Sequence, residues 1–418
     1  MGHSFIGGYF LNPYIQQFED ALNLAATQYE DGVVSVTPTA AGEQPHNKPY
    51  SLVRAGNVGY TAIILFARDP ERLEDVQEAE VGFGAADMGN KGAVGLRAVF
   101  RGGKSDDKDG HQQQQRGEVT LVATHLAAME WNLARRNANW AAIVRGLTFA
   151  NPEEVVERHR RNGSSSGTPA EDGDDEQTSL LGSAASEEEH ERLQRELHDI
   201  SVFKPSAHLF VAGDLNYRIS TTSPTPGTAF PSVEEGSENH YSKFLHRDQL
   251  TRERRAGRTL HGLSEAEVRF PPTYKYDVTV GKDGEVQWAF APHRYPGWTD
   301  RVLFLDTPAR ASAQVRVLSY DALPVLASSD HRPVYLRALV PLLPADEITA
   351  SLEGDDPRVR LPVEIDPEAW ERRKAARRKE ALLGWGTILW SSKEGAVVLG
   401  AAIALGVGWW WLSQTSWR

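Results

Sequence analysis

Short apolar segments alternate with amphipathic helical patterns through most of the chain. Continuous or alternating apolar runs predict strands at Tyr60–Ala67, Ala93–Phe100, Val119–Thr124, His208–Ala212, Arg301–Leu305 and Pro333–Leu339. Helical periodicity predicts helices at Asn12–Ala25, Glu130–Leu147 and Pro152–Arg161. Strands that are covered by helices on one face and by further strands on the other are typical of a layered α/β sandwich. We therefore predict a fold of this class.

The C-terminal segment Gly395–Leu412 differs from the rest because it has no charge over 18 residues. As a helix it would be roughly 27 Å long, which is about the thickness of a hydrocarbon core. Three tryptophans, Trp409 to Trp411, would lie at one interface, and a basic run at 372–379 favours keeping the preceding chain in the cytosol. A buried C-terminal helix is the alternative. The pattern favours a transmembrane tail anchor.

Two polar segments interrupt the apolar pattern. Residues 101–116 are Gly-rich without a period, and residues 163–189 mix Ser, Gly and acidic side chains. Such segments have little apolar surface to offset chain entropy, so we expect mobile surface loops. The resulting division is a folded domain over residues 1–344, a charged linker over 345–394 and the anchor over 395–412.

Composition excludes several classes of protein. The 418 residues carry 45 basic and 57 acidic side chains, a net charge of −12, and no cysteine. The acidic balance disfavours nucleic acid as a partner, because binding phosphates along a strand needs a basic face. The absence of cysteine excludes disulfides, a cysteine nucleophile and a thiolate zinc site. The first residues contain no secretory signal, so we expect the folded part in the cytosol.

Candidate chemistry gathers where apolar strands end. The segment HLFVAGDLNYR, residues 208–218, places Asp214 and Asn216 directly after a strand. A carboxylate there can accept a proton from water or bind a metal, and the amide can bind a phosphoryl oxygen. Asp and Asn are also common turn residues, so this motif alone leaves both interpretations open.

Three further polar residues flank strands in the same way. His125 ends one strand, Asp300 begins another, and His331 precedes a third in the sequence Ser-Ser-Asp-His. If Asp300 accepts a hydrogen bond from His331, it fixes the imidazole tautomer and favours the charged form. Each cluster could alone be a hydrogen-bonded turn, but four such clusters together indicate a site.

These motifs, taken in order, resemble those of the inositol polyphosphate 5-phosphatases. The segments that carry the resemblance are MGNKGAVGLR, THLAA, GDLNYRI, FPPTYKYD, PGWTDRVLF and SSDHRPV. They extend over about Tyr50 to Leu343, and Pro-Thr-Tyr-Lys-Tyr-Asp separates this family from related nucleases and sphingomyelinases. With the C-terminal segment, the chain resembles a tail-anchored member. The resemblance implies a four-layer sandwich of two mixed β-sheets flanked by helices.

The resemblance also implies magnesium-dependent removal of an inositol 5-phosphate. Asp214 would activate the attacking water and Asn216 would orient the water or the phosphate. His331, paired with Asp300, would stabilise charge on the phosphoryl group, with His125 as a further donor. The remaining implied residues are Asp330 near the metal, Tyr274, Lys275 and Arg294 at the 4-phosphate, and Asn90 and Lys91 near the 1-phosphate.

One departure from the family pattern leaves a second hypothesis open. The strands that carry Trp-Asn-x-Asn and Gln-Glu, the latter with the main magnesium ligand, do not occur in this sequence. A fragment, an inactive isoform and a compensated enzyme would each explain this. We predict a phosphatase that converts PtdIns(4,5)P2 to PtdIns4P at a cytosol-facing membrane, and we expect that membrane to be the endoplasmic reticulum. The alternative is a membrane protein that binds phosphoinositides without turnover. A related nuclease is disfavoured by the acidic charge.

Overall fold

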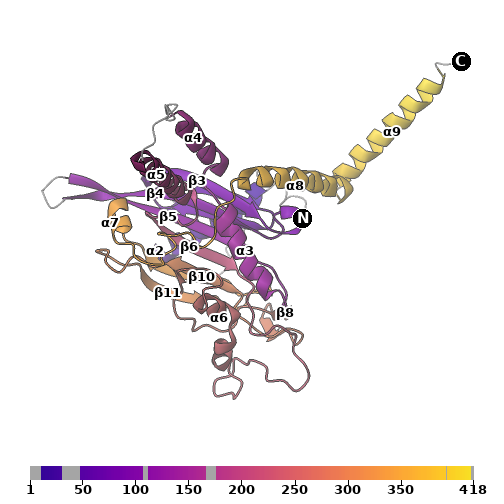
Figure 1. Ribbon diagram of the computed structural model, residues 1–418. Coiled ribbons are helices and arrows are strands. Elements are labelled where there is room, and N and C mark those ends of the chain that lie inside the picture. Colours follow the sequence, from indigo (N-terminus) through magenta and orange to yellow (C-terminus); the bar gives the residue numbers. More distant parts are fainter. Residues whose placement is uncertain (1–10, 31–47, 107–111, 166–175, 392, 416–418) are drawn as a thin grey trace.

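A six-stranded mixed sheet forms the centre of the computed structural model, which describes residues 11–30, 48–106, 112–165, 176–391 and 393–415 (Figure 1). In spatial order its strands are β3 (Leu73–Gly82), β4 (Gly92–Asp106), β5 (Gln112–His125), β6 (Ala207–Asp214), β10 (Asp300–Leu305) and β7 (Leu263–Ser264). The pair β5–β6 is parallel and the other neighbouring pairs are antiparallel. The predicted mixed α/β fold is therefore confirmed.

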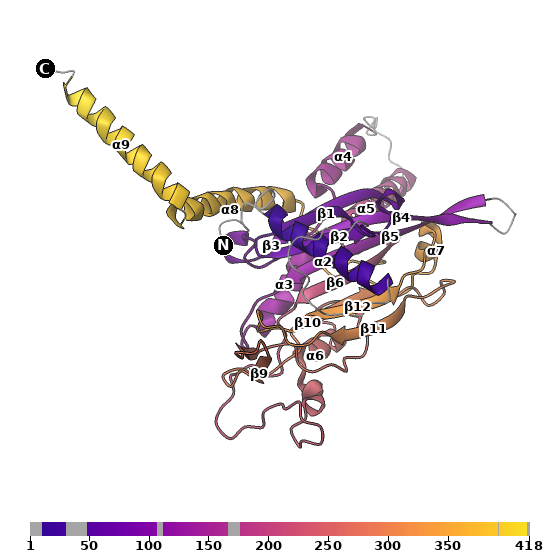
Figure 2. The same cartoon turned by 180° about the vertical axis from the view of Figure 1, so that it is seen from behind.

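Helices cover one face of this sheet and small sheets cover the other. On the first face lie α3 (Leu133–Gly146), α4 (Pro152–Ser165) and α5 (Glu176–Ile200) (Figure 1). On the second face lie two hairpins, with α2 (Asn12–Glu30) outside them (Figure 2). The hairpins are β1 (Ser51–Val58) with β2 (Thr61–Ala67), and β11 (Arg316–Ala322) with β12 (Val334–Leu339).

The predicted four-layer sandwich of two mixed sheets is not confirmed. Instead of a second large sheet, the structure has two separate antiparallel sheets of two strands each on that face. In the described ranges no strand lies between β2 and β12 to join them. Joining two hairpins into one sheet requires a continuous ladder of backbone hydrogen bonds, and the described residues do not provide it.

The main core lies between α3 and the central sheet. Trp140 and Ile143 of α3, and Leu147 directly after it, are fully buried with Leu209 and Val211 of β6. Residues four apart on a helix share a face, and alternate residues on a strand share a face, so both patterns bury one side. Burying side chains of this size stabilises the fold by about 1.5–3 kcal/mol each. This packing fixes β6, whose end carries Asp214.

A smaller core supports the other edge of the site. Trp298, Phe270 and Phe244 are buried together beneath β11–β12, and the Trp298 Nε1–H donates to the Phe270 carbonyl at 3.0 Å. Trp298 lies two residues before Asp300, so its packing fixes the start of β10. The remaining elements are η2 (Pro70–Arg72), η3 (Ala85–Asp87), η4 (Tyr241–Arg247), α6 (Gln249–Arg255), β8 (Tyr276–Val280), β9 (Val286–Phe290) and α7 (Ala345–Ala350).

The two segments predicted as loops contain regular structure where they are described. In residues 101–116, β4 and β5 continue as a hairpin, with Arg101 opposite Arg116 and Lys104 opposite Gln114. Once two strands are in register, backbone hydrogen bonds extend the ladder without needing apolar side chains. In residues 163–189, α4 reaches Ser165 and α5 begins at Glu176. Residues 107–111 and 166–175 lie outside the described residues.

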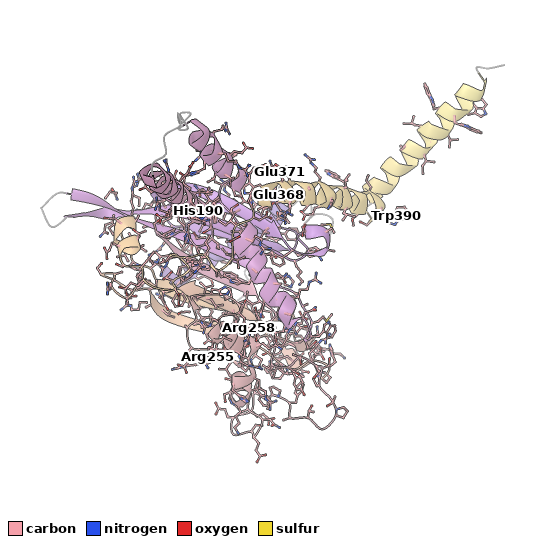
Figure 3. The ribbon with its side chains drawn as sticks, viewed as in Figure 1. His190, Arg255, Arg258, Glu368, Glu371 and Trp390 are labelled. Atoms are coloured by element: carbon pink, nitrogen blue, oxygen red, sulfur yellow. The ribbon has the colours of Figure 1, made fainter. Side chains whose placement is uncertain are left out.

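Two long helices follow α7. Helix α8 (Ala369–Ser391), within the predicted linker, lies along the sheet near α3, whereas α9 (Lys393–Thr415) extends away from the body (Figure 1). Trp390, near their junction, is 85% exposed (Figure 3). No helix in the described part of the chain is both long and apolar enough to cross a membrane. The predicted anchor at 395–412 is therefore not supported by the described residues.

Candidate active site

Three neighbouring strands place a predicted site residue at the same edge of the central sheet. In the parallel pair β5–β6, His125 lies opposite Asp214, and in the antiparallel pair β6–β10, Asp214 lies opposite Asp300. Sheet register therefore brings together three residues that are far apart in the sequence. His331 joins them from the segment before β12, where it forms an isolated bridge with Tyr274. We call His125, Asp214, Asp300 and His331 the strand-end cluster.

The turn after β6 has a backbone that few residues can adopt. Gly213 has a φ of 142°, and a Cβ at this position would lie 1.9 Å from the Thr124 carbonyl oxygen of β5. Only glycine avoids that clash. Asn216 has a φ of 57°, which Asn tolerates better than most residues. The sequence Gly-Asp-Leu-Asn is thus a requirement of this turn and also a source of functional groups.

Asp214 is held by donors on several sides. Its Oδ1 accepts from the backbone N–H of Asn216 at 3.0 Å and its Oδ2 from the side-chain amide of Asn216 at 2.8 Å. His125 Nε2 lies 3.3 Å from Oδ2. Burial opposes ionisation, but the hydrogen bond with His125 and the charges of His125 and His331 outweigh it, so the pKa of Asp214 lies below its ordinary value. Asp214 is a carboxylate at neutral pH.

Asp300 orients His331 as the sequence predicts. Its Oδ2 accepts from His331 Nδ1 at 2.9 Å and from the hydroxyls of Thr273 at 2.7 Å and Thr299 at 2.8 Å. Burial disfavours the imidazolium of His331, but the hydrogen bond and charge of Asp300 and the charge of Asp214 raise its pKa above the ordinary value. The second ring nitrogen, Nε2, is left to act on a ligand.

Tyr274 and Lys275 adjoin this cluster. The centroids of the Tyr274 and His331 rings lie 4.5 Å apart. The Arg218 guanidinium carbon lies 4.6 Å from the Tyr274 ring centroid. Lys275 Nζ donates to Asp330 Oδ2 at 2.6 Å. That hydrogen bond raises the pKa of Lys275 above its ordinary value. Lys275 is therefore a cation that is already paired.

Lys91 reaches the cluster from the loop before β4. Its Nζ contacts His125 Nε2. Burial lowers the pKa of Lys91, and the charge of Asp214 partly offsets this. Asn90 behaves differently: its Oδ1 is buried without a hydrogen-bond partner and packs closely on Gly84. The structure thus brings Lys91, but not the Asn90 side chain, against the strand-end cluster.

Arg294 is paired with an acid that sequence reasoning missed. Its Nη1 donates to Glu130 Oε2 at 2.8 Å, and the Glu130 side chain is only 3% exposed. Glu130 follows His125 by five residues, but no motif distinguishes it from a surface acid. Sequence reasoning also missed Thr273, Thr299 and Arg218. Arg218 had a signal, because it ends the Gly-Asp-Leu-Asn-Tyr-Arg motif.

The described residues do not by themselves form a metal site. Across the described ranges, no group of three or more His, Cys, Asp or Glu side chains could hold a metal ion. Asp214 already accepts from Asn216, and Asp330 is paired with Lys275. Two carboxylates are fewer than the three side chains of such a group, so the described residues alone do not make up a resident cation site.

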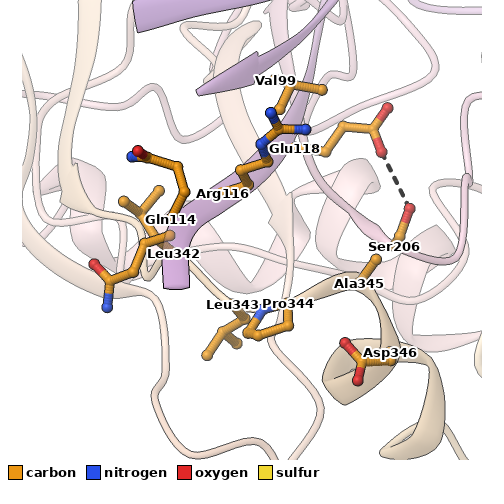
Figure 4. Close-up of a pocket in the computed structure, with 12 residues that line it drawn as sticks. Val99, Gln114, Arg116, Glu118, Ser206, Leu342, Leu343, Pro344, Ala345 and Asp346 are labelled. Carbon is orange, nitrogen blue, oxygen red and sulfur yellow. Dashed lines mark hydrogen bonds between the residues drawn. The ribbon is translucent and has the colours of Figure 1, made fainter. Parts of the chain in front are cut away.

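The strand-end cluster opens into a pocket. Asp214, Asp300 and His331 line a hollow of about 340 Å³ together with Arg332 and Val334. A larger pocket of about 430 Å³ lies near the opposite end of β5, where Glu118 accepts from the Ser206 hydroxyl at 3.1 Å (Figure 4). None of the predicted site residues lines that second pocket.

A profile of the endonuclease/exonuclease/phosphatase family 2 matches residues 13–337, which is most of the chain. The chain belongs to this family. The profile covers the whole strand-end cluster and the segments that hold Lys91, Lys275 and Arg294. The matched region also contains the central sheet.

Within the family, several relatives are named as phosphoinositide phosphatases. The polyphosphatidylinositol phosphatase INP53 of Saccharomyces cerevisiae is 27% identical over 293 residues, which cover 69% of this chain and 20% of that protein. Synaptojanin of Caenorhabditis elegans is 27% identical over 290 residues, 68% of this chain and 19% of that protein. The mouse phosphatidylinositol polyphosphate 5-phosphatase type IV is 34% identical over 151 residues, 34% of this chain and 22% of that protein.

This family member spans about a fifth of the length of the curated relatives that it matches. Among solved structures, the inositol polyphosphate 5-phosphatase domain of a synaptojanin, in complex with inositol (1,4)-bisphosphate and calcium, matches with a TM-score of 0.44 and 25% identity. The match covers 69% of this chain and 61% of that one.

Proposed function

We propose that this chain hydrolyses the 5-phosphate of phosphoinositides. The observation that supports this most directly is the meeting of a base, a donor and a cation at one sheet edge: Asp214 and His331 line one pocket, and Lys91 contacts the neighbouring His125. Phosphoryl transfer needs positioned donors and charges more than covalent chemistry. The names of the relatives in the same family point to the same substrate class.

The cluster supports a simple hydrolysis. The Asp214 carboxylate takes a proton from a water molecule whose oxygen bonds to phosphorus, while Asn216 holds the Asp214 carboxylate in place. The bond between phosphorus and the inositol oxygen breaks, and this oxygen takes up a proton from solvent. His331, whose pKa is raised by the hydrogen bond and charge of Asp300, donates through Nε2 to a phosphoryl oxygen. The products are a free inositol hydroxyl and inorganic phosphate.

PtdIns(4,5)P2 is the substrate that fits the paired cations best, with PtdIns4P as product. Lys275 and Arg294 would contact the 4-phosphate, and Lys91 a phosphate on the other side of the ring. Magnesium dependence and a role of Asp330 at the metal stay predictions from the resemblance, as does a location at the endoplasmic reticulum. Magnesium dependence is tested by comparing the activity in the presence of magnesium with the activity in the presence of a chelator.

The test of the proposal is phosphate release by the full chain from short-chain PtdIns(4,5)P2, with and without magnesium. We expect release from the wild type, a loss of at least about 100-fold in Asp214→Asn, and no change in Asp283→Asn, an exposed aspartate in the β8–β9 turn. Absence of release from the folded wild type would contradict the proposal. Vesicle binding that is lost in Lys275→Met would then favour the binding protein without turnover.

A further inference from the structure

Helix α8 reaches the substrate-binding loop through a buried hydrogen bond. Glu380 Oε1 accepts from the backbone N–H of Gly89 at 2.6 Å, although the two residues are 291 positions apart. The Glu380 side chain is only 3% exposed. A carboxylate that accepts a backbone N–H away from water makes a strong, charge-assisted hydrogen bond.

Glu380 is itself held in place by an ion-pair chain. Arg373, two turns earlier on the same face of α8, donates to Oε1 of Glu380 at 2.7 Å and to Oε2 at 2.9 Å. The Nε of the same Arg373 donates to Glu80 Oε1 of β3 at 2.6 Å. Glu80 lies just before the loop that leads to Gly89. These ion pairs and the hydrogen bond to Gly89 therefore join α8 to both ends of the segment 80–89.

The loop is tightly confined on its other side. A Cβ at Gly89 would lie 2.7 Å from Val58 Cγ2 and 2.8 Å from the Gly59 nitrogen. Gly89 is therefore enclosed between the β1–β2 turn and α8. Two residues further on, Lys91 contacts His125 of the strand-end cluster. A displacement of Gly89 would be transmitted directly to Lys91, because only Asn90 separates them.

We propose that Glu380 is a positioning residue, which fixes the loop 88–91 through Gly89 and so holds Lys91 against His125 of the strand-end cluster. The proposal rests on the proposed function for the role of Lys91. It assigns α8, which lies beyond the residues 13–337 matched by the family profile, to the working site. Glu380 does not contact the substrate and acts only through the loop.

Three full-length variants separate positioning from general stability. Glu380→Ala removes the acceptor of the Gly89 N–H. Glu380→Gln keeps a neutral acceptor there but weakens the pairing with Arg373. Glu371→Ala, on an exposed part of the same helix, breaks only the surface pair with Lys374 at 2.6 Å (Figure 3). We expect the KM for short-chain PtdIns(4,5)P2 to rise about tenfold in Glu380→Ala, with kcat within about twofold. Glu380→Gln stays within about threefold of wild type, and Glu371→Ala is unchanged.

Hydrogen exchange of the amides in residues 83–92 provides a readout that needs no activity. The Gly89 amide exchanges faster in Glu380→Ala and at the wild-type rate in Glu371→Ala. If Glu380→Ala does not fold, Glu380→Asp takes its place, because it keeps the charge and withdraws it from Gly89. The proposal is overturned if the Gly89 amide of Glu380→Ala exchanges at the wild-type rate. It is also overturned if the KM of Glu380→Ala, like that of Glu380→Gln, equals the KM of the wild type. A wild type that is protected at Gly89 but releases no phosphate overturns the proposed function alone.

Discussion

The strand-end cluster and the cations around it are held in different ways. Asp214, Asp300 and His125 occupy neighbouring register positions of one sheet, so backbone hydrogen bonds fix their spacing. The cations are instead fixed by acids: Lys275 by Asp330, and Arg294 by the buried Glu130. The first group is positioned by the fold, whereas the second is positioned by side-chain charge.

This difference has a consequence for binding. A substrate phosphate that approaches Lys275 or Arg294 must compete with a carboxylate already in contact, so part of the attraction is offset. At the strand-end cluster His331 lines an open pocket and is bound to Asp300 through Nδ1 and not through Nε2, so a ligand at Nε2 does not have to displace Asp300. Changes in the cluster should therefore affect turnover, whereas changes at the cations should affect affinity.

The largest effect is expected for Asp300→Asn. An amide cannot accept equally from His331, Thr273 and Thr299, so the imidazole loses its orientation and the stabilisation of its charge. We expect kcat to fall by at least about 100-fold, with KM within about threefold. Steady-state kinetics with Asp306→Asn, an exposed residue after the other end of β10, is the control. A change in KM with unchanged kcat would mean that Asp300, like Lys275 and Arg294, serves binding and not turnover.

A smaller effect is expected for Lys275→Met. This variant keeps the length of the side chain and removes its charge, which leaves Asp330 without its partner. We expect KM to rise about tenfold while kcat changes by less than about threefold. Lys282→Met, an exposed lysine in the β8–β9 turn, should leave both constants unchanged. Equal effects of the two lysine variants would reduce the role of Lys275 to surface charge.

Glu130→Gln tests the competition itself. Replacing the buried carboxylate weakens the hold on Arg294 and leaves the guanidinium freer to bind a 4-phosphate. We expect KM to decrease by about two- to threefold for a substrate with the 4-phosphate and to stay unchanged for one without it. Glu267→Gln, which breaks the exposed pair with Arg269, is the matched control. A rise in KM for both substrates would mean that Glu130 only supports the local structure.

The same difference explains what the sequence could predict. Asp214, Asp300 and His125 flank apolar runs, and a sheet made from those runs places them at one edge. Glu130 and Glu380 could not be found in this way, because their partners lie 164 and 291 positions away and no periodic pattern connects them. Local patterning predicts strands and their ends, whereas long-range ion pairs depend on how whole elements pack. The continuation of β4–β5 was missed for a different reason: backbone hydrogen bonds extend this ladder without an apolar pattern in the sequence.

The smallest effect concerns a histidine at the other end of β6, away from both groups. His208 Nε2 donates to the Pro341 carbonyl at 3.0 Å, and burial lowers the pKa of His208 below its ordinary value. The unfolded chain then binds the proton more readily than the folded chain. Stability is fully present above the unfolded pKa of about 6.5 and is lost as the pH falls through the folded pKa.

We therefore expect the urea midpoint of the wild type to fall between pH 7.5 and pH 5, and to fall less in His208→Gln, which keeps an N–H donor for the Pro341 carbonyl. The urea midpoint of His293→Gln, which replaces an exposed histidine, should fall by as much as that of the wild type. If the urea midpoints of His208→Gln and wild type fall by the same amount, the acid sensitivity does not come from His208. The linked charges of the strand-end cluster would then be the next groups to test. The comparison of the two ends of β6 thus decides whether the charges that serve turnover also limit stability in acid.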